Sequence, residues 1–273
     1  MPVGPYVPLL LSALWAVDPT GAVEEAEDVP AEPQGGAGIS PIEIIPRIEL
    51  RQSYTRLSNG VAVNATTPEV DMQFFRRVLL RYQLPVQVVK TPDGQISGVG
   101  DVRLETLIII ASTKVSLVGA IAGVVLDTAS QPQLGAGREQ LFFGGGLAGK
   151  PFVWWLLYGV AQELLSVGGK NSVRPDVNQL AVRAGSIVFG KQYNWFKLDL
   201  DTTVDFLEKR GRFYGTVEMG SLLVGRVGMF ARAGTQLVGQ RELDFSLAAG
   251  VRYLFRLETS KPRPGGHPDG GSL

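Results

Sequence analysis

The chain has 273 residues, and its 26 basic residues balance its 26 acidic residues. Without a basic excess, the composition gives no electrostatic footprint for nucleic acid, and we expect no nucleic-acid partner. The sequence contains no cysteine, which excludes disulfide frameworks, thiolate metal sites and cysteine nucleophiles. We expect neither a metal nor a cofactor.

The residues offer little for catalysis. The single histidine, His267, lies in a segment rich in proline and glycine that is typical of a disordered tail. Histidine-assisted mechanisms need an imidazole held in place by its neighbours. Paired carboxylates such as Asp199 and Asp201 could perform acid–base chemistry, but they lie on a regular alternating segment without other marks of a substrate site. We therefore predict no catalytic residues and no enzymatic activity.

The N-terminal part indicates export. Residues 1–22 resemble a signal peptide, since the apolar core Tyr6–Val17 precedes small residues suited to cleavage. No Lys or Arg precedes this core, so an atypical signal, a misassigned start and a buried N-terminal segment remain alternatives. Residues 23–45 are acidic and rich in Pro, Ala and Gly, which predicts a linker. We expect one domain over residues 46–257 and a disordered tail over 258–273.

Alternation of apolar and polar residues dominates the domain. In Phe196–Phe206 every second residue is apolar except Thr202, and Glu242–Leu257 has one apolar and one mostly charged face. A period of two predicts strands, because a helix would mix these residues over its faces. Eleven candidate strands cover residues 47–57, 71–84, 99–111, 114–127, 138–147, 152–167, 177–189, 193–207, 212–224, 226–238 and 241–257.

The lengths of these strands favour a membrane. Most reach the roughly 9–11 residues that a tilted strand needs to cross a bilayer, whereas strands of soluble proteins typically run about 5–6. Tight turns are expected at Ser112-Thr113, Gly190-Lys191, Gly225-Arg226 and Gly239-Gln240, and longer loops at 58–70, 85–98, 128–137 and 168–176. Short turns at one rim and long loops at the other are the pattern of outer-membrane barrels.

We predict an all-β fold, a single closed antiparallel up-and-down transmembrane β-barrel of about 12 strands. Bacterial outer-membrane barrels have even strand numbers, so one strand is missing from the count, and we expect it within residues 138–167. A soluble barrel or sandwich is the alternative, because the same alternation serves both designs.

Two resemblances support this fold. Gly250, Tyr253 and Phe255 resemble the C-terminal insertion signal of outer-membrane barrels, which implies the barrel assembly machinery as a partner. Four further groups of residues occur in order: Phe74–Tyr82, Gly98–Val102, Thr128–Ser130 with Leu134–Gly137, and Val177–Leu180. Their order and spacing resemble the outer-membrane β-barrel family of transporters assigned to the phenol meta-degradation pathway. The resemblance implies a Gram-negative outer membrane, contact with its lipid, and porin-like transport of small, hydrophobic or aromatic compounds.

Charged residues on the strand faces alternate with the expected lipid face, so we predict that they point into the lumen. They are Arg77, Arg81, Asp101, Arg103, Glu105, Lys197, Asp199, Asp201, Asp205, Arg232, Glu242, Asp244 and Arg252. Two interpretations stay open: an ion-pair network that fills a narrow barrel, and a permeation path with selectivity charges. The leading function is accordingly a channel or transporter for small molecules. A structural barrel with a filled lumen is the second, and a membrane-embedded lipid hydrolase the third.

Overall fold

The computed structural model describes residues 46–75, 77–113, 115–168, 176–190, 194–224, 226–239 and 242–255. The predicted signal peptide, linker and tail lie almost entirely outside these residues. The strands within them are β1 (Arg47–Leu57), β2 (Ala62–Phe74), β3 (Val78–Gln83), β4 (Val86–Thr91), β5 (Gly94–Val99), β6 (Val102–Ser112), β7 (Ser116–Leu126), β8 (Glu139–Phe152), β9 (Trp155–Gly168), β10 (Asn178–Phe189), β11 (Asn194–Asp205), β12 (Arg210–Val224), β13 (Val227–Val238) and β14 (Leu243–Leu254). A short 3-10 helix, η1 (Pro132–Leu134), lies between β7 and β8.

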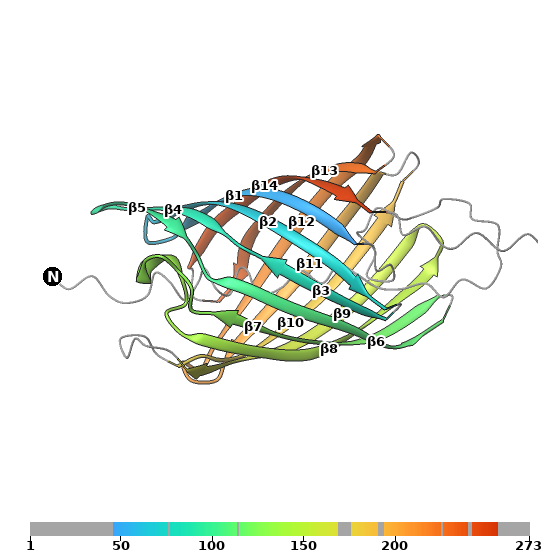
Figure 1. Cartoon of the computed structure of the whole chain (residues 1–273), viewed down its shortest axis with the longest axis horizontal. Helices are drawn as coiled ribbons and strands as arrows, with labels where there is room; N and C mark the ends of the chain where they lie inside the picture. The colour runs from blue at the N-terminus through green and yellow to red at the C-terminus, as the bar shows by residue number, and fades with distance from the viewer. Residues whose placement is uncertain are drawn as a thin grey trace, which may run out of the picture.

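These strands close into one antiparallel barrel of 12 strands, as the sequence predicts (Figure 1). Strand β1 is paired with both β2 and β14, which closes the sheet. Two of the barrel strands are each interrupted once, so that β3 and β4 form one and β5 and β6 form another. The first interruption falls at Leu84-Pro85, where proline lacks the N–H that a continuous ladder needs.

The strand missing from the sequence-based count is β2, so placing it within residues 138–167 was wrong. Residues 58–70 were expected to be a loop and residues 71–84 a strand, whereas β2 ends at Phe74, β3 begins at Val78, and Phe75 and Arg77 lie in turn positions between them. Pro68 lies within β2 and its carbonyl accepts a hydrogen bond from the Leu84 N–H at 3.2 Å. A proline inside a candidate strand argues against that assignment, which explains the error.

The second expected loop, residues 85–98, is also β structure. Strands β4 and β5 form a hairpin that projects beyond the rest of the barrel, at the left of Figure 1. Pro92 and Asp93 form its turn, and Gly94, the first residue of β5, has φ of +152°. The sequence Pro92-Asp93-Gly94 is a recognised turn signal that the sequence-based assignment did not use.

The two rims differ, and we name them by their connections. The turn end is the rim where β1 begins and β14 ends, with short turns at residues 75–77 and 153–154. The loop end is the opposite rim, with the β4–β5 hairpin and residues 127–138. The connection that follows Val238 also lies at the loop end. The tight turn expected at Gly239-Gln240 is therefore at the opposite rim from the other expected tight turns.

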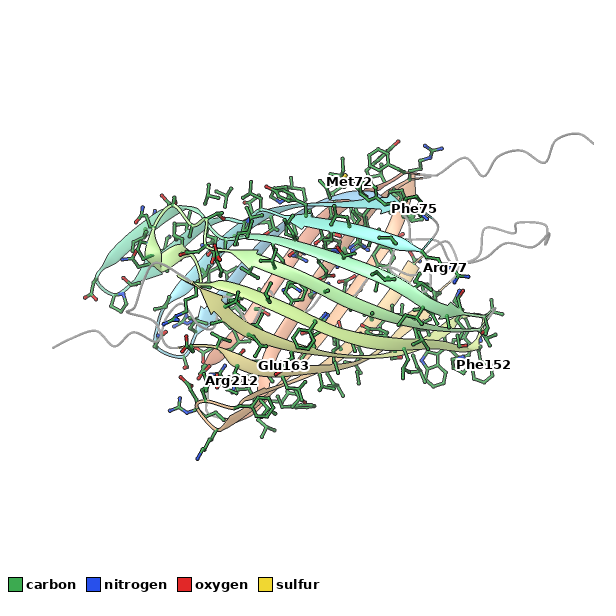
Figure 2. The ribbon with its side chains drawn as sticks, turned by 60° about the horizontal axis from the view of Figure 1, so that its bottom comes forward. Met72, Phe75, Arg77, Phe152, Glu163 and Arg212 are labelled. Carbon is green, nitrogen blue, oxygen red and sulfur yellow. The ribbon has the colours of Figure 1, made fainter. Side chains whose placement is uncertain are left out.

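The outer face of the barrel is apolar. Large hydrophobic side chains such as Ile48, Leu198 and Leu247 are exposed there, with 39–50% of their surface accessible. On β14 the exposed residues are Phe245, Leu247, Val251, Tyr253 and Phe255, the face that the alternation predicts. Side chains cover the outer surface along the barrel (Figure 2). A soluble barrel rarely exposes an apolar surface of this extent, so the alternation here serves a lipid-facing wall.

Among the described residues, no helix is long and apolar enough to cross a membrane.

Candidate functional site

The interior of the barrel is lined by charged side chains that are almost fully buried. Nine of them expose 2% or less of their surface: Arg47, Glu49, Glu69, Asp71, Arg81, Lys197, Asp199, Glu218 and Arg252. Ionised groups are stable away from water only when they are paired and hydrogen-bonded. The interior contacts therefore decide whether the lumen is a filled core or a solute path.

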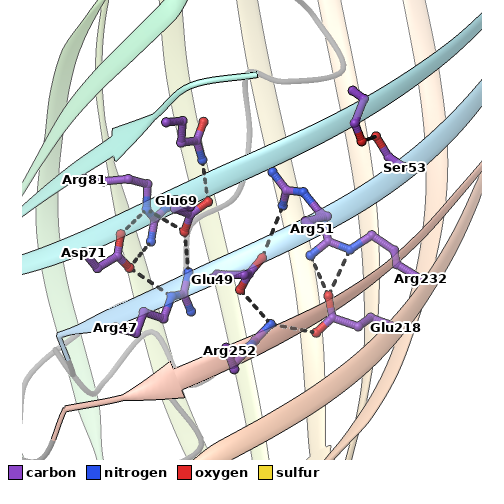
Figure 3. A network of polar contacts seen from close by, with 12 residues as sticks. Arg47, Glu49, Arg51, Ser53, Glu69, Asp71, Arg81, Glu218, Arg232 and Arg252 are labelled. Atoms are coloured by element: carbon purple, nitrogen blue, oxygen red, sulfur yellow. Dashed lines mark hydrogen bonds and ion pairs between the residues drawn. The ribbon is translucent and has the colours of Figure 1, made fainter. Parts of the chain in front are cut away.

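The first ion cluster consists of Arg47, Glu69, Asp71, Arg81 and Glu105, from β1, β2, β3 and β6. The Arg81 guanidinium donates to both carboxylate oxygens of Asp71, at 2.8 and 2.9 Å, and lies 3.3 Å from Glu105. Arg47 contacts Glu69 at 2.8 Å and Asp71 at 3.1 Å (Figure 3). The cluster fixes four neighbouring strands through bidentate contacts, which hold both partners in one geometry.

Arg103 extends this cluster. Its guanidinium lies 2.7 Å from Glu105 and sits over the Phe142 ring, 3.9 Å from the centroid. The stacking places a cation against an aromatic face inside the barrel. Three predicted lumen charges, Arg81, Arg103 and Glu105, thus meet in one network.

The second ion cluster consists of Glu49, Arg51, Glu218, Arg232 and Arg252, from β1, β12, β13 and β14. Arg252 lies 3.2 Å from Glu49 and 3.8 Å from Glu218, and Arg232 donates to Glu218 at 2.5 and 2.9 Å. Arg51 lies 3.7 Å from Glu49. Figure 3 shows this chain of contacts across the wall where β14 meets β1.

Aromatic rings pack beside the second ion cluster. The Arg252 guanidinium lies 4.6 Å from the Phe230 ring centroid and 5.4 Å from that of Trp195, whose indole N–H donates to Glu218 at 3.0 Å. A Cβ at Gly250 would lie 2.5 Å from the Phe230 ring. Gly250 therefore has a packing role in the barrel, whatever it contributes to the insertion signal.

The remaining predicted charges on β11 and β12–β14 are also paired. Lys197 lies 3.3 Å from Asp199, which also accepts a hydrogen bond from the Tyr158 hydroxyl, and Arg183 lies 2.6 Å from Asp201. Asp205 accepts from the Gln179 amide at 2.9 Å and from the backbone N–H groups of Leu207 and Glu208 at 2.9 Å. Glu242 pairs with Arg212 at 2.9 Å.

Three predicted lumen charges lie elsewhere. Arg77 is exposed in the turn between β2 and β3, at the turn end (Figure 2), because the chain reverses inside the expected strand 71–84. Asp244 is partly exposed at the loop end, where the β1–β14 register shifts, and lies 3.8 Å from Arg56. Asp101 binds the neighbouring loop.

Several lumen charges escaped the sequence analysis: Arg47, Glu49, Arg51, Glu69, Asp71, Arg183, Arg212 and Glu218. The signal for those on β1 was present, because Arg47, Glu49 and Arg51 occupy alternate positions of a predicted strand. Glu69 and Asp71 were hidden by the assignment of residues 58–70 to a loop.

Asp101 holds the loop of residues 127–138 against the barrel. One carboxylate oxygen accepts from the N–H groups of Thr128 and Ala129 at 3.1 and 3.0 Å, and the other accepts from Ala136. The loop carries Leu134, which is 1% exposed in an apolar cluster at the loop end. That cluster consists of Leu57, Val61, Val63, Val89, Leu134, Tyr214 and Leu243. Asp101 thereby keeps Leu134 in this cluster.

We expect Asp101→Ala to release this loop, because the N–H groups of Ala129 and Ala136 lose their carboxylate acceptor and that of Thr128 keeps only the Leu126 carbonyl. An unsatisfied buried donor costs about 1–3 kcal/mol. Hydrogen exchange of residues 127–138 in the purified protein should accelerate in the variant, while exchange in β11 stays unchanged. Asp101→Asn keeps one acceptor oxygen and serves as the milder variant. Equal protection of the loop in the wild type and in Asp101→Ala would contradict this role.

The stability of the protein should also depend on pH through the carboxyl group of Asp101. Burial raises the pKa of Asp101 above its ordinary value. The hydrogen bonds from three backbone N–H groups lower this pKa, but their effect is smaller than that of burial. A group with a raised folded-state pKa adds stability at low pH, and this contribution is lost as pH rises through the folded pKa. Asp101→Asn should remove that part of the pH dependence.

A cavity of about 130 Å³ lies inside the barrel towards the loop end. Charged side chains of Arg51, Arg183, Arg232, Asp199 and Asp201 line it, together with the hydroxyl-bearing residues Ser53, Thr55, Thr203, Tyr214, Thr216 and Ser246. We call it the hydroxyl-lined cavity. Arg51 and Arg232 belong both to its lining and to the second ion cluster. Within the part of the chain that the structure describes, no group of three or more His, Asp or Glu side chains could hold a metal ion.

Comparison with family models and with curated proteins gives no match. Solved structures do match. An outer membrane channel from Pseudomonas putida F1 is 15% identical, with a TM-score of 0.62 over 84% of this chain and 100% of that chain. The NanC porin is 9% identical with a TM-score of 0.56, and the KdgM porin is 7% identical with a TM-score of 0.55. Each covers 77% of this chain, and 100% and 99% of the porins are covered. The chain thus has the fold of a 12-stranded outer-membrane channel.

Proposed function

We propose that the protein is an outer-membrane channel for small molecules. The observation that carries the proposal is the hydroxyl-lined cavity, whose wall combines charged, hydroxyl-bearing and apolar residues, inside a closed barrel whose outer face is apolar. Solute selectivity in such barrels comes from charges and hydrogen-bonding groups along the lumen. The turn end would face the periplasm and the loop end the exterior, as in other outer-membrane barrels.

The finer parts of the proposal rest on the sequence. Residues 1–22 as a signal peptide, a Gram-negative outer membrane, and recognition of Tyr253 and Phe255 by the barrel assembly machinery follow from the resemblances described above. So do hydrophobic or aromatic solutes. Both aromatic side chains are exposed on the outer face of β14, where another protein could reach them.

In the described conformation, two barriers flank the hydroxyl-lined cavity. The apolar cluster with Leu134 lies on the side of the loop end, and the two ion clusters lie elsewhere in the lumen, together with a second group of buried apolar residues that includes Ile121, Phe142 and Tyr158. A solute would have to displace Leu134 and then pass between paired charges. We therefore expect small, infrequently open conductances rather than the steady current of a wide porin.

A structural barrel with a filled lumen is the second candidate. Complete burial of Lys197 and Arg47, together with the interior rings of Tyr158 and Trp195, favours it. A filled interior behaves as a packed core, in which ion pairs stabilise one arrangement of strands.

Conductance in planar lipid bilayers separates the two candidates. For a channel, the double substitution Asp199→Asn with Asp201→Asn should shift the reversal potential in a salt gradient towards anion selectivity, because two negative charges leave the cavity wall. Arg56→Gln, at an exposed residue of the loop end, is the matched control and should leave selectivity unchanged. A protein that inserts and remains closed at all voltages would support the filled lumen instead.

A further inference from the structure

The charge on the wall of the hydroxyl-lined cavity indicates which solutes suit it. Its lining holds three arginines and two aspartates, an excess of one positive charge. Arg183 contacts Asp201 at 2.6 Å, and both side chains are largely buried. Asp199 contacts Lys197, which is buried and does not line the cavity. The positive excess therefore lies with Arg51 and Arg232, on the side of the second ion cluster.

Arg51 and Arg232 can exchange carboxylate partners. Both reach from the cavity wall to a glutamate, Arg51 to Glu49 at 3.7 Å and Arg232 to Glu218 at 2.5 Å. Those two glutamates are also held by Arg252, at 3.2 and 3.8 Å. A carboxylate entering the cavity could take the outer donors of Arg51 and Arg232 while Arg252 keeps its contacts with Glu49 and Glu218. The three guanidinium groups would then face three carboxylates, so the charges would balance. Guanidinium groups suit such an exchange, because their donors match two carboxylate oxygens.

The rest of the wall supplies hydrogen bonds to uncharged polar groups. Ser53, Thr55, Thr203, Thr216 and Ser246 bring hydroxyls from four strands to one space. Each hydroxyl can donate and accept, so together they suit a solute with several hydroxyl groups. The volume is roughly ten times the 10–15 Å³ that one buried water needs, which fits a small molecule.

We propose that the hydroxyl-lined cavity binds a small hydroxylated carboxylate, with the carboxylate on Arg51 and Arg232 and its hydroxyls on the Ser and Thr wall. The proposal rests on the proposed channel function, and it assigns a polar, charged solute class in place of the hydrophobic or aromatic solutes that the resemblance implies. The site would lie between the apolar cluster of the loop end and the second ion cluster. A solute bound there would lie next to the charged side chains that it must pass on its way through the lumen.

The test uses the full chain purified in detergent and isothermal titration calorimetry. Gluconate is the probe, sorbitol is its uncharged counterpart with a similar set of hydroxyls, and hexanoate is the carboxylate without hydroxyls. We expect gluconate to bind at least about tenfold more tightly than either, the factor for losing one charge-assisted hydrogen bond. Equal binding of gluconate and sorbitol, or of gluconate and hexanoate, would overturn the proposal, as would no binding of gluconate.

Variants place the site within the barrel. Arg232→Gln should weaken gluconate binding at least about tenfold. Arg56→Gln removes an exposed arginine outside the cavity and should leave the affinity unchanged. If Arg232→Gln does not fold, Thr216→Val removes one wall hydroxyl at nearly constant volume and should still weaken gluconate and leave hexanoate unaffected. Unchanged gluconate affinity in folded Arg232→Gln or Thr216→Val would refute the placement.

Failure of this inference differs from failure of the channel function. If the protein conducts but does not bind gluconate, the channel function holds and this solute class is excluded. If it binds gluconate but never conducts, the binding site holds and the channel function is excluded.

Discussion

Arg81→Met is expected to destabilise the barrel by about 3–5 kcal/mol, the cost of removing one partner from a buried ion pair. Arg81 is 2% exposed and lies within 3.3 Å of Asp71, Glu69 and Glu105. Without it, three carboxylates of the first ion cluster lose their shared cation, and methionine offers no donor in exchange. Urea unfolding of the protein refolded into lipid vesicles measures the loss.

Arg77→Met is the matched control. Arg77 lies four residues before Arg81, but it is exposed in the turn, so its substitution should leave the free energy of unfolding nearly unchanged. Adding Asp71→Leu to Arg81→Met should recover part of the loss, because the carboxylate that lost its bidentate partner and kept only Arg47 is removed as well. Similar stabilities of Arg77→Met and Arg81→Met would show that the first ion cluster does not hold these strands.

Leu247→Arg is expected to impair insertion and folding by about 2–4 kcal/mol, the cost of an arginine on the lipid face near the middle of the bilayer. Leu247 is 50% exposed on the outer face of β14 and is paired with Tyr54 of β1 and Ala233 of β13. Folded and unfolded forms separate by their mobility on gels without heating. The unfolding free energy in vesicles gives the magnitude.

The neighbouring residue provides the control for the two faces. Ser246 is half-buried and alternates along β14 with the exposed Leu247, so Ser246→Arg should be tolerated better than Leu247→Arg. Leu247→Met keeps an apolar side chain and tests for a loss of packing alone. If arginine were tolerated equally at both positions, the lipid and lumen faces of β14 would be misassigned.

Sequence reasoning recovered the barrel because its outer face obeys a strict period of two. In β11 and β14 most apolar residues face outward and most polar ones inward, with Trp195, Leu243 and Leu254 as buried apolar exceptions, so the pattern and the structure largely coincide. It failed at β2, where Pro68 and the small residues around it weaken the contrast between the faces. Register is a property of paired strands, and no single segment contains it.

The sequence predicts which residue types line the candidate site, but it does not predict which charged residues pair with one another. Alternation predicts that Arg81, Lys197 and Arg252 face the lumen, and in the structure all three side chains are buried. Their partners are remote: Arg252 pairs with Glu49, and Arg232 with Glu218. Such pairs depend on which strands become neighbours and on the tilt of the barrel. The hydroxyl-lined cavity draws on six strands and has no local sequence signal.

The pairing of β1 with β14 has a consequence for how the barrel is made. This pair places Arg47 beside Leu254, which lie near opposite ends of the barrel sequence. The other neighbouring strands of the wall follow one another closely in sequence. Closing a long loop costs more chain entropy than closing a short hairpin, so this seam should form last. The contact between Glu49 and Arg252 spans the same seam. A nearly complete, unclosed sheet would carry both charges at its open edges, and each neutralises the other only when the wall is sealed.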